Sequence, residues 1–151
     1  MTMAKRRPLI LGNWKMHGTG SDLAEVERID AAVQALGVEA GLMLPATLIE
    51  RAARRARAVA IGGQDCHAAA QGAHTGGVSA AMLRESGATM VLAGHSETRA
   101  GDASSVAAKA HAAQAAGLAV VICVGECERS ADARALVAAQ LRASLPPGLD
   151  R

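Results

Sequence analysis

Residues 7–16 read RPLILGNWKM, an apolar run that leads into a glycine, an asparagine and a lysine. The run has the length of a short β-strand, and side chains two residues apart on a strand project to the same side. Asn13 and Lys15 are therefore expected to face one pocket. In parallel sheets, ligand-binding groups gather at the C-terminal ends of the strands. An amide beside an ammonium group suits an anionic or carbonyl-bearing ligand; the alternative is that Lys15 is only a solvated charge at the end of a strand.

The rest of the chain alternates short apolar runs with segments of helical periodicity. Helices are predicted over residues 21–36, 47–56, 79–86, 104–116 and 132–145. Strands are predicted over residues 38–44, 58–61, 89–93 and 118–124, and a long glycine-rich connection over 64–78. Continuous apolar strands separated by helices indicate an α/β fold, with a parallel sheet covered by helices. We expect a single domain over residues 1–151.

Composition excludes several classes of function. The net charge of +2 is small and Trp14 is the only aromatic residue, so the chain has neither a basic surface nor stacking side chains for nucleic acid. No apolar run approaches the roughly 20 residues of a membrane helix, and residues 1–8 do not resemble a secretory signal. Cys66, Cys123 and Cys127 form no CxxC pair, which is typical of free thiols in a reducing compartment. We therefore expect a cytoplasmic protein without nucleic-acid or membrane partners.

A second polar group follows the predicted strand 89–93. Residues 94–97 read GHSE, so His95 is expected to share an edge of the sheet with Lys15. Ser96 and Glu97 are expected to open a short helix, whose positive end would disfavour a protonated imidazole. A neutral His95 could then donate a hydrogen bond to a ligand; the alternative is a histidine that serves packing alone. Glu97 is interpreted as an ion-pair partner for Lys15 or for a neighbouring helix.

Two further clusters are open to more than one interpretation. Asp65, Cys66, His67 and His74 contain metal-ligating groups, but their spacing fits no standard zinc pattern, so no metal is predicted. Four arginines between residues 51 and 57 could bind an anion, but they are typical of a solvated helix face.

Four motifs together resemble the triosephosphate isomerase family. They are GNWKM at 12–16, GAHTGGVS at 72–79, GHSE at 94–97 and CVGE at 123–126, in the order and at the intervals of that family. The resemblance implies a TIM (β/α)8 barrel, of which this chain would form an incomplete barrel of about five βα units. It implies the interconversion of glyceraldehyde 3-phosphate and dihydroxyacetone phosphate, a small phosphorylated triose substrate, no cofactor, and a homodimer.

The resemblance also assigns roles to residues. Asn13 and Lys15 would contact the substrate, and Lys15 would stabilise the negative charge of the developing enediolate. His95 would polarise the carbonyl and move protons between the two oxygens. The supporting residues would be Glu97, which would hold Lys15, Ser96 in the same motif, and Thr75, which would reach across the dimer interface to the partner's site.

Three positions depart from the family pattern. Gly77 and Thr98 stand where the family usually has a glutamate and an arginine that pair across the subunit interface. Because both are missing together, no unpaired buried charge is expected. Asp65 stands where the family commonly has an asparagine.

The resemblance runs to residues 145–150, which are similar to the connection before strand six of the family. The glutamate base, the closing lid and the glycine-rich phosphate loops would come later, so we expect no general base in these 151 residues and doubtful activity for the chain alone. Open strand edges would favour aggregation. One alternative is a short, non-catalytic phosphate-binding or interaction module that keeps Lys15 and His95. Another is an unrelated open α/β fold of the flavodoxin type, which would need a phosphate-binding glycine loop that residues 12–16 do not resemble.

Overall fold

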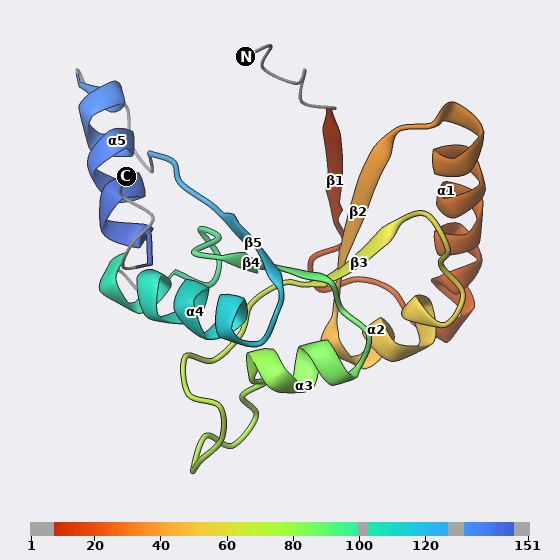
Figure 1. Cartoon of the computed structure of the whole chain (residues 1–151), viewed down its shortest axis with the longest axis horizontal. Helices are drawn as coiled ribbons and strands as arrows, with labels where there is room; N and C mark the ends of the chain where they lie inside the picture. The colour runs from red at the N-terminus through yellow and green to blue at the C-terminus, as the bar shows by residue number, and fades with distance from the viewer. Residues whose placement is uncertain (1–7, 100–102, 127–131, 147–151) are drawn as a thin grey trace, which may run out of the picture.

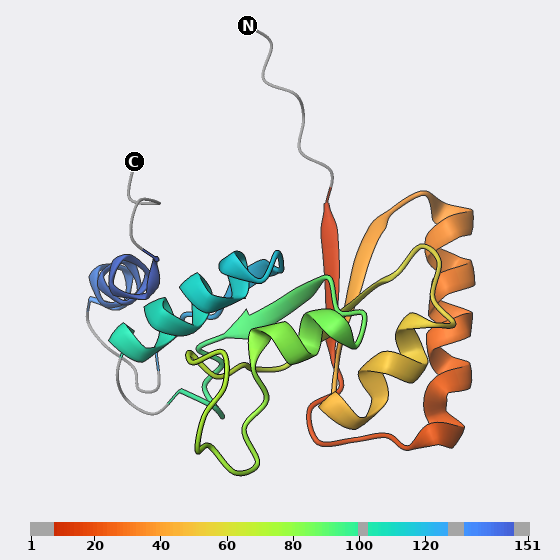
Figure 2. The ribbon, with the colours of Figure 1, turned by 60° about the horizontal axis from the view of Figure 1, so that its bottom comes forward.

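The computed structural model describes residues 8–99, 103–126 and 132–146. Its parallel sheet has the order β1-β2-β3-β4-β5, with β1 (Leu9–Asn13), β2 (Glu39–Leu44), β3 (Ala60–Gly63), β4 (Met90–Ala93) and β5 (Ala119–Ile122). The helices are η1 (Gly20–Asp22), α1 (Leu23–Leu36), α2 (Ala46–Ala53), α3 (Ala80–Glu85), α4 (Ala103–Ala115) and α5 (Ala133–Ser144). The sheet curls and the helices lie along its outside (Figure 1, Figure 2). The predicted α/β fold with five βα units is confirmed as a curled, incomplete barrel.

The sheet packs apolar side chains on both of its faces because its strands are apolar at nearly every position. Leu42 and Leu44 of β2 point outward into the main core beneath the helices. Between them, Met43 points inward and packs with Met90 of β4 in a smaller cluster, as the two-residue period of a strand requires. A Cβ on Gly62 would lie 2.6 Å from the Sδ of Met43. The methionines therefore fill space that larger β3 side chains would occupy.

β1 is an edge strand that is exposed on both faces. Ile10 is 58% exposed and Leu9, which points to the opposite face, is 49% exposed. Strands of parallel α/β sheets are normally buried on both faces. Within the described parts of the chain, β1 pairs with β2 alone. This edge of the sheet therefore presents apolar side chains and backbone groups without a strand partner.

A buried carboxylate on α1 determines where β3 begins. The Asp30 Oδ1 accepts hydrogen bonds from the backbone N–H groups of Arg57, Ala58 and Val59, at 2.8, 2.7 and 2.8 Å. Burial alone would raise the pKa of Asp30, but these hydrogen bonds and one from Gln34 together lower it. The predicted start of the strand at residue 58 was wrong, because residues 57–59 bond to Asp30 before pairing with β2 begins at Ala60.

The arginines near α2 form a solvated face, as the sequence indicated. Arg54 pairs with Glu50 of the same helix and Arg55 pairs with Glu27 of α1. Arg51 donates to the backbone oxygen of Thr47. Helix α2 ends at Ala53, three residues earlier than predicted.

Candidate active site

Three of the predicted site residues meet at the C-terminal edge of the sheet. The Lys15 Nζ lies 2.9 Å from the Glu97 Oε1, and the other carboxylate oxygen of Glu97 lies 3.6 Å from the His95 Nδ1. One carboxylate thus pairs with the ammonium group after β1 and lies beside the imidazole after β4. The Lys15 hydrogen bond, followed by the positive charge of that side chain, holds the pKa of Glu97 below its usual range.

His95 is oriented as a hydrogen-bond donor. The backbone N–H of Glu97 donates to the His95 Nδ1 at 3.2 Å, so the ring proton belongs on Nε2. Residues 96–98 form a turn, in which the N–H groups of Thr98 and Arg99 donate to the His95 carbonyl at 2.9 and 2.8 Å. The continuation of the expected short helix falls on residues 100–102, which lie outside the described residues. Ser96 is exposed in this turn. The backbone N–H of Glu97 therefore occupies Nδ1 and leaves Nε2 as the ring donor.

Lys15 reaches the site by a different route from the predicted one. β1 ends at Asn13, and Lys15 lies beyond the strand with φ +53°, the only positive φ of a non-glycine residue in the described parts of the chain. The argument that strand periodicity aligns Asn13 and Lys15 was therefore wrong. Instead, the Asn13 Oδ1 accepts the backbone N–H of Lys15 at 2.8 Å. The asparagine side chain bonds the lysine backbone, and the lysine side chain extends to Glu97.

Gln64, directly after β3, was not predicted as a site residue. Its Nε2 lies 2.7 Å from the Lys15 carbonyl oxygen, 3.1 Å from the Asn13 Oδ1 and 3.2 Å from the Met43 carbonyl oxygen. The sequence did offer one indication of Gln64: it is a polar residue that directly follows a predicted strand and the pair Gly62 and Gly63.

Arg99 holds the backbone next to His95, and it was not predicted as a site residue. Its Nε donates to the Gly94 carbonyl at 3.1 Å, and its Nη2 donates to the Cys123 carbonyl at 2.8 Å. The same Nη2 lies 3.3 Å from the Oγ of Ser144, a fully buried residue of α5. Arg99 thereby links β4, β5 and α5 next to a cavity of about 520 Å³ that His95 and Ser96 help to line.

Thr75 lies on the long connection between β3 and α3, which extends away from the sheet (Figure 1, Figure 2). The connection is closed at its base by the His67 N–H bonded to the Val78 carbonyl, at 2.8 Å. Near its tip, the Gly77 N–H donates to the His74 carbonyl at 2.8 Å. Thr75 is exposed on this turn. The structure therefore presents it outward and does not bring it to Lys15 of the same chain.

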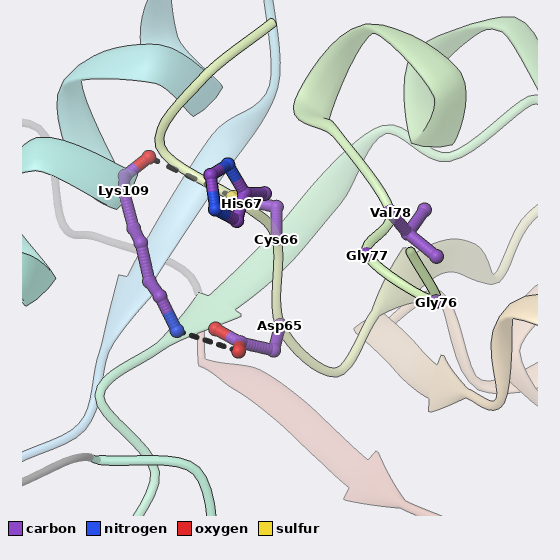
Figure 3. Close-up of a pocket in the computed structure, with 7 residues that line it drawn as sticks. All are labelled: Asp65, Cys66, His67, Gly76, Gly77, Val78 and Lys109. Carbon is purple, nitrogen blue, oxygen red and sulfur yellow. Dashed lines mark hydrogen bonds and ion pairs between the residues drawn. The ribbon is translucent and has the colours of Figure 1, made fainter. Parts of the chain in front are cut away.

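Three of the four residues that were considered as metal ligands, Asp65, Cys66 and His67, line a cavity of about 260 Å³ between the start of this connection and α4 (Figure 3). The Asp65 Oδ2 pairs with the Lys109 Nζ at 2.6 Å, and the rings of His67 and His74 stack with their centroids 3.9 Å apart. Burial, and then the charge of Asp65, raise the pKa of the Cys66 thiol to about 11. Among the described residues there is no group of three or more ligands that could hold a metal ion. Gly77, one of the departures noted above, borders this cavity.

Comparison with known proteins identifies the family. The sequence model of triosephosphate isomerase matches residues 8–148. The chain belongs to the triosephosphate isomerase family. It is 55% identical over 150 residues to the triosephosphate isomerase of Ruegeria sp. (strain TM1040), covering 95% of this chain and 61% of that protein. It is 50% identical to the enzyme of Jannaschia sp. (strain CCS1), covering 94% and 60%.

The fold agrees with this family. The crystal structure of triosephosphate isomerase from Bartonella henselae superposes with a TM-score of 0.88 at 43% identity, covering 95% of this chain and 63% of that one. The open sheet is therefore part of a TIM barrel, as the sequence predicted. The chain spans about three-fifths of the length of the curated relatives that it matches. No helix among the described residues has the length and apolar character needed to cross a membrane.

Proposed function

We propose that this chain supplies the electrophilic half of a triosephosphate isomerase active site. The enzyme would interconvert D-glyceraldehyde 3-phosphate and dihydroxyacetone phosphate, and so act in glycolysis and gluconeogenesis. The observation that carries the proposal is that Lys15 and His95 lie beside one carboxylate, Glu97, at the C-terminal edge of the sheet: Glu97 pairs with the Lys15 Nζ at 2.9 Å and lies 3.6 Å from the His95 Nδ1. Membership of the family supports it.

In the proposed reaction, His95 donates a hydrogen bond from Nε2 to the substrate carbonyl. A base removes the proton from the carbon next to the carbonyl, and the resulting negative charge on the enediolate oxygens is stabilised by the Lys15 ammonium. His95 moves a proton between the two oxygens, and the carbon-bound proton returns to the neighbouring carbon. Asn13 contacts the substrate beside Lys15. We propose that the base is a glutamate in the part of the relatives' length that this chain does not span.

We further propose a homodimer in the cytoplasm. The exposed turn at Thr75 would reach the partner's site, as the family resemblance implies. The two cysteines in the described residues, Cys66 and Cys123, are free thiols, which supports a reducing compartment. Because Gly77 and Thr98 replace the glutamate and the arginine of the family, this interface would lack one ion pair that a typical family member has. The proposal includes no cofactor and no metal.

The protein expressed from its natural gene provides the test. Turnover of glyceraldehyde 3-phosphate is measured for the unmodified protein, for Lys15→Met and for Arg28→Met, a matched loss of one exposed positive charge on α1. Removing a group that stabilises an oxyanion typically lowers kcat by about 100- to 1000-fold. We expect that loss for Lys15→Met and no change for Arg28→Met.

The alternative function, a non-catalytic phosphate-binding module, predicts a different result. Such a protein would bind inorganic phosphate in a Lys15-dependent manner without any turnover. Its intact mass would match that of the 151-residue chain. Phosphate binding with no turnover in the unmodified protein would therefore contradict the isomerase proposal and support the module.

A further inference from the structure

The backbone of Lys15 is held in a conformation that its residue type disfavours. Its φ is +53°, a region in which the Cβ of an ordinary residue approaches the following carbonyl oxygen. Residues persist there only where surrounding contacts over-determine the local structure. Lys15 itself is half-exposed, with its side chain 51% accessible to solvent. Packing around a half-exposed side chain constrains the backbone only weakly, so the backbone contacts of Lys15 are the main candidates for holding this conformation.

Those contacts converge on one amide group. The Gln64 Nε2 makes its shortest hydrogen bond, 2.7 Å, to the carbonyl oxygen of Lys15. The Asn13 Oδ1 lies 3.1 Å from the same nitrogen and also accepts the Lys15 N–H at 2.8 Å. Both polar groups of the Lys15 backbone are thus tied, one directly and one through Asn13, to the side chain of Gln64.

The third neighbour of Gln64 anchors this arrangement to the sheet. The Met43 carbonyl oxygen, at the end of β2, lies 3.2 Å from the Gln64 Nε2 and accepts the Trp14 N–H at 3.0 Å. An amide nitrogen carries two hydrogens, so it shares them among three acceptors. The Gln64 side chain therefore crosses from the end of β3, past β2, to the segment after β1.

We propose that Gln64 is a positioning residue for Lys15: its amide keeps Lys15 in the left-handed conformation that directs the ammonium group to Glu97. The consequence for catalysis rests on the proposed function, but the consequence for the Lys15–Glu97 contact does not. Without the amide, Lys15 relaxes to an ordinary backbone conformation and its Nζ leaves the Glu97 carboxylate.

The first test measures the Glu97 carboxylate by carbon-13 NMR titration in the protein expressed from its natural gene. The Glu97 signal is assigned from the spectrum of Glu97→Gln. Gln64→Leu removes the amide, and Gln114→Leu makes the same chemical change at an exposed position of α4. Because the Lys15 hydrogen bond is the main cause that lowers the pKa of Glu97, we expect that pKa to rise toward its usual range in Gln64→Leu and to stay low in Gln114→Leu. A folded Gln64→Leu protein with an unchanged Glu97 pKa would overturn the proposal.

A second measurement needs no variant and tests the hydrogen bonds on which the proposal depends, whether or not Gln64→Leu folds. In the unmodified protein, hydrogen exchange of the Gln64 side-chain amide should be slower than that of the exposed Gln114 amide. Equal exchange rates would overturn the proposal.

Turnover gives a third readout, which depends on the proposed function. We expect kcat to fall by up to about 100-fold in Gln64→Leu, since a displacement of about 1 Å at a reacting centre has that effect. KM should change less, because the lysine acts mainly on the transition state. An unmodified protein without turnover would contradict the proposed function, and the Glu97 titration would still decide the role of Gln64.

Discussion

Replacing Asp30 with alanine removes the acceptor that holds the start of β3. Three backbone N–H groups lose their partner, those of Arg57, Ala58 and Val59. Arg57 and Ala58 are exposed and can bond to water, whereas Val59 is only 5% exposed. A buried donor without a partner costs about 1–3 kcal/mol, which applies to Val59. The N–H groups of Arg57 and Ala58 regain water, so each of these two lost bonds costs about 0.5 kcal/mol, the low end of the net contribution of a hydrogen bond. We expect Asp30→Ala to lower the free energy of unfolding by about 2–4 kcal/mol.

Asp30→Asn removes the negative charge of the side chain but keeps nearly the same shape, so it measures the contribution of the charge alone. Its side-chain oxygen can still accept from residues 57–59, but as a neutral and weaker acceptor, so we expect a loss of about 1 kcal/mol. The folded state lowers the pKa of Asp30. The stability that its charge contributes is therefore fully present above the pKa of an unfolded aspartate, and it is lost as the pH falls through the folded value. The difference in the free energy of unfolding between the unmodified protein and Asp30→Asn should therefore become smaller as the pH falls.

The assay is urea unfolding, followed by circular dichroism, of the protein expressed from its natural gene. It is run at neutral pH and again in steps toward acid for all three forms. Equal unfolding midpoints for Asp30→Ala and the unmodified protein would refute the reasoning. So would a difference between Asp30→Asn and the unmodified protein that stays constant across the acid range, because the charge would then contribute nothing.

Two substitutions and one labelling experiment test separate parts of the structure. Gly94 has φ +78°, and a Cβ there would lie 2.9 Å from the Val106 Cγ1. Gly94→Ala should therefore displace His95 and lower kcat. Unchanged kinetics would contradict this prediction. Ile10→Lys places a charge on the exposed β1 edge. The 151-residue polypeptide with this substitution should therefore aggregate less than the unmodified polypeptide, as measured by sedimentation velocity. Equal aggregation of the two would argue against the β1 edge as the cause of aggregation. Burial raises the pKa of Cys66 to about 11, so iodoacetamide at pH 8 should alkylate it only after unfolding in urea, as read by peptide mass spectrometry; rapid native alkylation would contradict the burial.

Much of the fold could be predicted because its determinants are local. Helix α1 ends at Leu36, where Gly37 takes the left-handed conformation that its position after the apolar periodicity indicated. The apolar runs of β2, β4 and β5 fall within the predicted strands. The motifs after β1 and β4 were correctly placed on one edge, because parallel strands in successive βα units bring their C-terminal ends together.

The remaining features depend on contacts between distant parts of the chain. Gln64 bonds to Asn13 across 51 positions of sequence, and Asp30 bonds to Val59 across 29. The local sequence pattern gives no sign of such a hydrogen bond. The predicted strand therefore began earlier than β3 does, and Gln64 was not predicted as a site residue. The left-handed backbone of Lys15 likewise depends on Gln64, which follows β3 and also bonds to Met43 of β2. A lysine after an apolar run gives no local indication of it.

The measurement that tests the central claim most directly is the turnover of glyceraldehyde 3-phosphate by the protein from the natural gene, with and without His95. His95→Gln removes the proposed proton-transfer group, and His111→Gln is the matched change at an exposed position of α4. A positioned acid–base group contributes about 100- to 10,000-fold. We expect turnover by the unmodified protein, a loss of that size for His95→Gln, and full activity for His111→Gln. An unmodified protein without turnover, or a His95→Gln variant as active as the unmodified protein, would contradict the account.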